Sequence, residues 1–215
     1  MAGEPDPTVT TPVRPTTPSS VADHCARMVG HNWRMYGAHR NLGADSGDMT
    51  TLRRCVGSVL DIGCGPGLLV VALTDLGHPA MGIDVCPIAV ARTVRSGGAA
   101  LRRSVFDWLP NEGRWDTALL IDGNVGIGGD PHALLERVAR LVSGRGLLLV
   151  ETAPADVDER HRVRLDDGHG GLGSPFWWAA VGLTAMLRRA RETGWAAAEH
   201  WTARGRTFVA LRRAP

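Results

Sequence analysis

A strand, a tight turn and the start of a helix are encoded in one run: Ser58-Val59-Leu60-Asp61-Ile62-Gly63-Cys64-Gly65-Pro66-Gly67. The apolar residues predict a buried strand over about 57–62, and three glycines at alternate positions predict a turn. Glycine lets the backbone approach a ligand without a Cβ atom in the way. The helix that follows presents unpaired N–H groups at its N-terminus. This arrangement is typical of a nucleotide-binding α/β unit.

Two kinds of cofactor use such a turn. A dinucleotide-binding turn reads G-x-G-x-x-G/A, and Leu68 stands where its third small residue would fall. The whole run Val-Leu-Asp-Ile-Gly-Cys-Gly-Pro-Gly closely resembles the first motif of the class I S-adenosylmethionine (SAM)-dependent methyltransferases. The resemblance covers about residues 55–152 and points to the type 11/12-like enzymes that act on small molecules.

Apolar segments alternate with amphipathic ones along the rest of the chain. Further strands are predicted at about 79–84, 99–104, 116–121 and 146–151, with helices at about 66–77, 87–96 and 130–144. Beyond them we expect a polar strand or an excursion at 160–166, a helix at about 178–193, and closing strands at about 195–201 and 206–212. This order predicts a parallel sheet covered on both faces. The resemblance implies a Rossmann-like α/β fold, a three-layer sandwich with a seven-stranded, mostly parallel sheet whose last strand is antiparallel.

The chain divides into three parts. Residues 1–20 are rich in Pro and Thr and lack apolar periodicity, so we expect a disordered tail. Residues 21–54 are expected to form a helical lid, and residues 55–215 the SAM-binding methyltransferase domain. The candidates for ligand contact in the lid are His24, His31, Trp33, Tyr36 and His39.

Composition narrows the possible functions. The formal net charge is +2 without a basic block, so nothing indicates a nucleic-acid partner. The chain has no lysine, which excludes a lysine Schiff base. Its cysteines form no C-x-x-C pair, so no metal site is predicted and free thiols in a cytoplasmic protein are expected. No apolar run reaches the ~20 residues of a membrane span, so no membrane partner is expected.

Acidic residues end the first two predicted strands. Ligands of open α/β sheets lie beyond the carboxyl ends of the strands. The resemblance places the methionine part of SAM at Asp61 and the glycine turn, which comprises Gly63, Cys64, Gly65 and Gly67. Asp84 follows Asp61 by 23 residues, near the position where an acid usually holds a ribose diol. Val85, the next residue, is expected to contact the adenine.

The third and fourth predicted strands supply the rest of the expected site. The resemblance implies an acid near Asp107 or at the position of Ser104 for the adenine amino group, with Val105 beside it. The fourth strand runs into Asp122-Gly123-Asn124, where the reacting methyl group and the acceptor are expected to meet. We expect Asp122 to take part in cofactor binding and catalysis, and Asn124 to position the acceptor.

The acceptor side is predicted from the region after the fifth strand. His169 lies in a glycine loop and is a candidate general base. The remaining candidates for the acceptor wall are Arg162, Arg164, Ser174, Phe176, Trp177 and Trp178.

The sequence therefore predicts SAM-dependent methyl transfer to a small molecule, in a monomer or homodimer. The acceptor atom (O, N, S or C) is open, and a role in secondary metabolism is one possibility. Three alternatives remain: an NAD(P)-dependent oxidoreductase, a non-catalytic SAM-binding or interaction module, and SAM chemistry other than methyl transfer.

Overall fold

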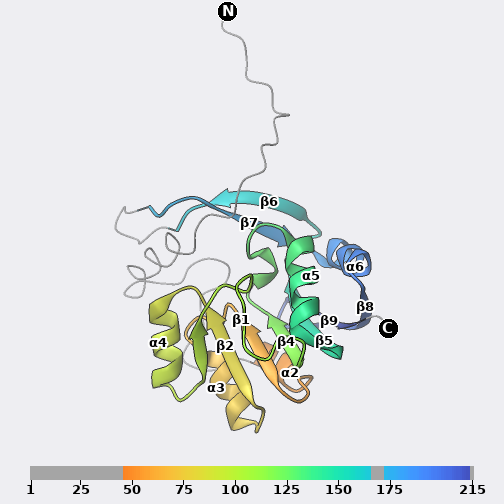
Figure 1. Cartoon of the computed structure of the whole chain (residues 1–215). Helices are drawn as coiled ribbons and strands as arrows, with labels where there is room; N and C mark the ends of the chain where they lie inside the picture. The colour runs from red at the N-terminus through yellow and green to blue at the C-terminus, as the bar shows by residue number, and fades with distance from the viewer. Residues whose placement is uncertain (1–45, 166–171, 214–215) are drawn as a thin grey trace, which may run out of the picture.

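The computed structural model describes residues 46–165 and 172–213, which fold around a seven-stranded sheet flanked by helices (Figure 1). The strand order is β3-β2-β1-β4-β5-β9-β8. The strands of this sheet are β1 (Val59–Ile62), β2 (Ala80–Asp84), β3 (Ala100–Arg102), β4 (Trp115–Leu120), β5 (Val142–Thr152), β8 (Trp195–Ala203) and β9 (Arg206–Arg213). Only β9 runs against the others, because it pairs antiparallel with both β5 and β8. The predicted three-layer, mostly parallel Rossmann-like fold is confirmed.

The order of the central strands creates the site. Strand β1 pairs with β2 on one side and with β4 on the other, so the chain changes direction across the sheet between them. Ligands bind at such a switch point, beyond the carboxyl ends of the strands. The segments that follow β1, β2 and β4 therefore meet at one edge of the sheet.

Helices cover both faces of the sheet. They are α2 (Ser46–Leu52), α3 (Leu68–Asp75), α4 (Pro87–Arg95), α5 (Pro131–Leu141) and α6 (Leu183–Glu192), with a short 3-10 helix η1 (Asn124–Gly126). One buried cluster joins α2 and α3 to the sheet through Leu52, Leu73 and Phe208. A second joins α5 and α6 to the opposite face through Leu134 and Met186. Alternate residues of the buried strands point to the two clusters, as expected for a sheet with two covered faces.

The segment between β5 and α6 differs from the prediction. The expected helix at 178–193 begins only at Leu183, because residues 176–181 form strand β7 (Phe176–Val181). This strand pairs antiparallel with β6 (Asp158–Val163), and the two form a separate ribbon, at the top of the view in Figure 1. An aromatic run such as Phe176-Trp177-Trp178 suits a strand, and Gly182 marks the start of the helix.

The predicted N-terminal parts lie largely outside the described residues. The expected tail (1–20) and most of the expected lid, with its candidates His24, His31, Trp33, Tyr36 and His39, precede residue 46. Helix α2 is the part of the lid segment that the structure describes. No helix within the two described ranges is long and apolar enough to cross a membrane.

Candidate cofactor and acceptor site

The glycine turn after β1 adopts backbone conformations that favour glycine. The φ angles are 75° at Gly63, 52° at Gly65 and 81° at Gly67, in the left-handed region. A Cβ atom on Gly63 would lie 2.7 Å from Nδ2 of Asn124. A Cβ atom on Gly65 would meet no described atom within 4 Å, so this backbone faces open space. The turn is therefore held tightly at its ends and open in the middle, as a ligand-binding turn requires.

Asp84 organises that turn from the end of β2. One carboxylate oxygen accepts a hydrogen bond from the Gly65 N–H at 2.9 Å, and the other accepts one from the Cys86 N–H at 2.8 Å. Burial raises the pKa of Asp84, while these backbone hydrogen bonds act in the opposite direction. The predicted proximity of Asp84 to the glycine turn is confirmed, and ribose binding by this carboxylate stays a prediction.

Asp61 carries a buried carboxyl group close to other acidic side chains. Only 3% of the residue is exposed, and no hydrogen bond to its side chain is seen among the described residues. Burial, followed by the charges of Asp122, Asp84 and Asp48, raises the pKa of Asp61 to about 8. A buried anion of this kind is costly unless a cation or several donors neutralise it. A positively charged group placed beside Asp61 would lower this pKa and favour the carboxylate.

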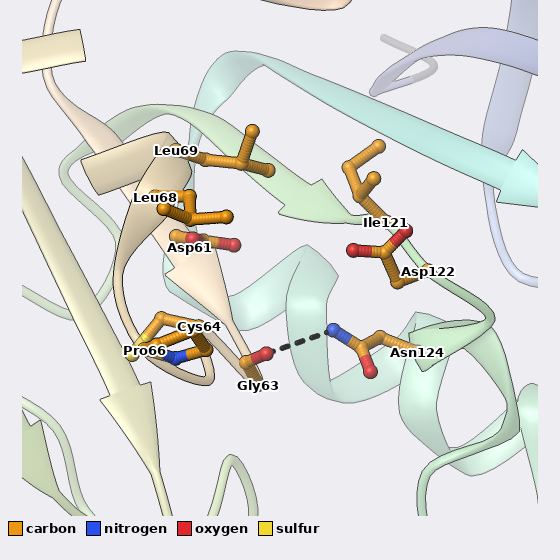
Figure 2. Close-up of a pocket in the computed structure, with 9 residues that line it drawn as sticks. All are labelled: Asp61, Gly63, Cys64, Pro66, Leu68, Leu69, Ile121, Asp122 and Asn124. Carbon is orange, nitrogen blue, oxygen red and sulfur yellow. Dashed lines mark hydrogen bonds between the residues drawn. The ribbon is translucent and has the colours of Figure 1, made fainter. Parts of the chain in front are cut away.

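A cavity of about 50 Å³ lies between the glycine turn and the end of β4 (Figure 2). The carboxylates of Asp61 and Asp122 face each other across it, as Figure 2 shows. Its lining residues are Asp61, Gly63, Cys64, Pro66, Leu68, Leu69, Ile121, Asp122 and Asn124. Three residues predicted for the cofactor (Asp61, Gly63 and Cys64) and one predicted for catalysis (Asn124) line this cavity together with Asp122, which was predicted for both.

Asn124 connects the two sides of this cavity. Its side-chain nitrogen donates to the carbonyl oxygen of Ile62 at 2.8 Å and to that of Gly63 at 3.1 Å, the second of which Figure 2 shows. The amide group thus fixes η1 against the glycine turn, which is a different task from the predicted contact with an acceptor. Acceptor positioning by Asn124 stays a prediction.

A second cavity of about 70 Å³ adjoins the first and shares Asp122 with it. Its lining residues are Asp122, Gly123, Val125, Glu151, Thr152, Ala153, Pro154, Trp178, Ala179, Ala180 and Val181. Trp178 lies against η1, pairs with Ile127 and makes an edge contact with Phe176 at 6.2 Å between ring centroids. Trp177 lies on the opposite side of β7, where the guanidinium of Arg160 stacks on its ring at 4.4 Å. Of the three predicted aromatic residues, Trp178 is the one that lines this cavity.

The predicted adenine contacts lie in and near the loop after β3. The side chain of Val105 is buried in the core, whereas Asp107 is exposed and accepts a hydrogen bond from the Ser104 N–H at 3.0 Å. Val85 is half-buried beside Asp84. None of these three predicted residues lines either cavity, and their roles stay predictions.

The remaining residues predicted for the acceptor side do not line either cavity or lie outside the described residues. His169 lies outside the described residues. Arg162, Arg164 and Ser174 are exposed, and neither cavity includes them.

Sequence reasoning missed two residues at the junction of the cavities. Glu151 lies near the end of β5 and lines the second cavity, and Arg206 at the start of β9 donates to it at 2.7 and 2.5 Å. An acid at the end of a predicted parallel strand was a usable signal for Glu151. No sequence signal pointed to Arg206, because its hydrogen-bond partners lie far away in the chain. Among the described residues no group of His, Cys, Asp and Glu is arranged to hold a metal ion.

Comparison with solved structures shows the same fold in several methyltransferases. A SAM-dependent methyltransferase from Bacteroides fragilis, in complex with S-adenosyl-L-homocysteine (SAH), is 22% identical with a TM-score of 0.63, covering 78% of this chain and 76% of its own. Magnesium protoporphyrin IX methyltransferase from Synechocystis PCC 6803, with bound SAM, is 16% identical with a TM-score of 0.61, covering 92% and 97%. The 1,6-didemethyltoxoflavin-N1-methyltransferase of Burkholderia thailandensis is 16% identical with a TM-score of 0.58, covering 77% and 74%. A search of curated proteins finds no match.

The sequence itself matches a family model described as a methyltransferase domain. The match runs over residues 37–198 and so includes the glycine turn, both cavities and the β6–β7 ribbon. Together with the shared fold, it confirms the predicted resemblance. The chain belongs to this methyltransferase-domain family.

Proposed function

We propose that this protein transfers the methyl group of SAM to a small-molecule acceptor. The observation that carries the proposal is the pair of adjoining cavities that meet at Asp122, the first of which holds the buried carboxyl group of Asp61 beside an open glycine turn. The first cavity fits a cationic cofactor, and the second gives an acceptor access to the same point.

The residues present fit SAM. The amino acid part of SAM carries an ammonium group, and Asp61 and Asp122 provide carboxylates on both sides of the first cavity. Asp84 has lone pairs left for ribose hydroxyl groups after accepting one backbone hydrogen bond at each oxygen. When bound, SAM supplies an electrophilic methyl group whose S–CH₃ bond breaks with the electron pair going to sulfur, while the acceptor's lone pair forms the new bond.

The protein's own contribution is alignment and exclusion of water. The glycine turn, Asp84 and the Asn124 amide fix the cofactor side, and the β6–β7 ribbon with Trp178 covers the acceptor side. Holding two reactants in line contributes about 7–11 kcal/mol to lowering a barrier. Asp122 and Glu151 stand at the meeting point and can accept a proton from the acceptor.

The acceptor is proposed to be a small molecule with an apolar or planar body. The second cavity is lined by Trp178, Val125, Val181 and small residues, with the carboxylates of Asp122 and Glu151 at one end. These carboxylates accept hydrogen bonds, so they favour acceptors that present an N–H or O–H group. Small molecules are named for two of the structural relatives, 1,6-didemethyltoxoflavin and magnesium protoporphyrin IX. The atom that is methylated, and a place in secondary metabolism, stay open.

Calorimetry tests the cofactor assignment. Titration of the purified full-length protein with SAM and with SAH is expected to give saturable binding, whereas NAD and NADP give none. Binding of NAD instead would favour the oxidoreductase alternative, and no heat with any of them would refute the proposal.

Product analysis tests the chemistry. With methyl-labelled SAM and a panel of small amines, alcohols and phenols, label is expected in one acceptor together with stoichiometric SAH. SAM binding with no transfer to any acceptor would favour the non-catalytic module. Label in any product other than a methylated acceptor would favour other SAM chemistry.

A further inference from the structure

The guanidinium of Arg206 joins three carboxylates from three different elements. It donates to Glu151 at the end of β5 at 2.7 and 2.5 Å, to Asp48 of α2 at 2.8 Å, and to Asp122 after β4 at 3.3 Å. The side chains of Arg206, Asp48 and Glu151 are exposed by only 17%, 0% and 14%. Charged hydrogen bonds among these three side chains are strong and geometrically specific, whereas the Asp122 side chain is 49% exposed.

This network controls the backbone at the junction of the cavities. Asp122 has a φ angle of 59°, in a region that L-residues rarely adopt. Its N–H donates to Glu151 Oε2 at 2.7 Å, and the same carboxylate receives two hydrogen bonds from Arg206. Arg206 thus orients Glu151, and Glu151 in turn holds Asp122 in the conformation that separates the two cavities.

Stacked side chains hold the guanidinium itself in place. Arg206 lies over the ring of Phe208 at 4.9 Å, and Phe208 stacks on Trp201 with 5.3 Å between ring centroids. Arg54 covers the other face of Trp201 at 4.0 Å, and Trp201 donates to Thr50 of α2 at 2.8 Å. The position of Arg206 is therefore set by the β8–β9 hairpin and α2 before any ligand binds.

The charge of Arg206 matters for methyl transfer in particular. Transfer removes a positive charge from sulfur, so carboxylates near the sulfur stabilise the donor relative to the product. Asp48, Asp61, Asp122 and Glu151 gather at this junction. The guanidinium of Arg206 is hydrogen-bonded to three of these carboxylates, so its positive charge reduces the extent to which they favour SAM over SAH.

We propose that Arg206 is a positioning residue, which fixes Asp122 and Glu151 between the cavities and offsets the carboxylate charge at their junction. The inference rests on the proposed function. It makes a specific prediction, because SAM and SAH differ by one methyl group and one positive charge. The ratio of their dissociation constants reports the charge at the sulfur, and a loss of general stability would not change it.

The experiment measures Kd for SAM and SAH by calorimetry in four variants and the wild type. Arg206→Gln is expected to lower the ratio Kd(SAM)/Kd(SAH) by about threefold or more, because one positive charge is removed. Arg206→Lys keeps the charge, so the ratio is expected to stay while both affinities fall, since lysine cannot reproduce the forked hydrogen bonds. Glu151→Gln removes a carboxylate and is expected to raise the ratio.

Arg212→Gln is the matched control. Arg212 is an exposed arginine near the opposite end of the same strand, opposite Leu147 of β5, and both Kd values are expected to be unchanged. An unaltered ratio in both Arg206→Gln and Glu151→Gln would overturn the inference while leaving the proposed function intact. If Arg206→Gln does not fold, the ratio in Glu151→Gln decides alone. Failure of the wild type to bind either ligand would instead refute the proposed function.

Discussion

Asp61, which we propose binds the cofactor, lowers the stability of the ligand-free protein at high pH. In the absence of a ligand its carboxyl group is buried among other acids, which raises its pKa to about 8. The ordinary pKa of an aspartate is 3.8, so the folded protein binds this proton more tightly than the unfolded chain does. The resulting stabilisation is complete below about pH 4 and is lost as the pH rises through 8.

Replacing Asp61 by Asn is expected to remove the loss of stability that occurs as the pH rises through 8. At pH 8, Asp61→Asn is expected to raise Tm by about 2 °C or more, because the neutral amide has no buried charge to lose. Its Tm should also fall less than that of the wild type between pH 5 and pH 8. Differential scanning calorimetry at several pH values measures both effects.

The matched control is Asp75→Asn, at an exposed aspartate near the end of α3, which should leave the pH profile unchanged. The same Asp61→Asn protein is expected to bind SAH at least about tenfold more weakly, since a charge-assisted contact is lost. An Asp61→Asn variant that is less stable at pH 8 than the wild type would contradict this assignment.

Asn124 offers a second test at the same scale. In Asn124→Ala the hydrogen bonds to Ile62 and Gly63 are lost, so each of these two backbone carbonyl groups loses a donor. We expect a loss of about 1–2 kcal/mol in the free energy of unfolding. SAH binding should weaken severalfold because the glycine turn is no longer fixed.

Chemical denaturation and calorimetry measure these quantities for Asn124. Asn124→Asp serves as the contrasting variant, because it keeps the size but replaces the donor with an acceptor, and it should be at least as damaging. If Asn124→Ala left both SAH binding and methyl transfer unchanged, Asn124 would be removed from the active site.

At the scale of elements, a buried arginine on α5 fixes the loop after β3. Arg137 donates to the carbonyl oxygens of Val105 at 2.8 Å and Asp107 at 2.6 Å, and forms two hydrogen bonds with Glu112. The hydrogen bonds from Arg137 lower the pKa of Glu112 to about 2. These hydrogen bonds make the shape of the loop depend on α5. The loop also carries the predicted adenine contacts, so Arg137 supports that part of the site.

Arg137→Gln is therefore expected to destabilise the protein by about 2–3 kcal/mol, since buried carbonyl groups and the Glu112 carboxylate lose their donor. The control Arg140→Gln changes an exposed arginine one turn later on α5 and should stay within about 0.5 kcal/mol of the wild type. Denaturant unfolding monitored by fluorescence gives both values. Equal effects of the two substitutions would show that the contacts of Arg137 contribute little.

The helices and strands that could be predicted are those whose conformation follows from consecutive residues of the sequence. Strand β1, the glycine turn and α3 follow from consecutive residues, and Pro131 after Asp130 marks the start of α5, where Asp130 accepts from the Ala133 N–H. The segment 176–181 could not be predicted in this way. Its strand conformation depends on pairing with residues 158–163, which lie on the other side of a loop.

At the scale of the whole molecule, the number of strands in the sheet and its antiparallel last strand were predictable, and the charge network was not. The alternation of strands and helices, with the resemblance of the first motif, was enough to predict the seven-stranded sheet and its antiparallel strand β9. Arg206, in contrast, is 158 residues from Asp48 and 84 from Asp122. No local pattern connects residues that only the folded sheet brings together.

Ligand binding and protonation are also coupled through the whole fold. The pKa of Asp61 is raised to about 8, so at pH 6 its carboxyl group is protonated, whereas at pH 8.5 the carboxylate is available. If the ligand ammonium group binds at Asp61, as we propose, it must displace that proton at pH 6. SAH at about one hundred times its Kd stabilises a protein by about 2.7 kcal/mol. For a chain of 215 residues this corresponds to a Tm increase of about 5–11 °C.

At a fixed SAH concentration, the Tm increase is therefore expected to be clearly larger at pH 8.5 than at pH 6. NAD at the same concentration should leave Tm unchanged at both pH values. In Asp61→Asn the SAH effect should be smaller and nearly independent of pH, because no proton is exchanged. Thermal unfolding of the wild type and the variant at both pH values measures this. A wild-type shift that is equal at the two pH values would mean that the positive charge of the ligand is neutralised somewhere other than at Asp61.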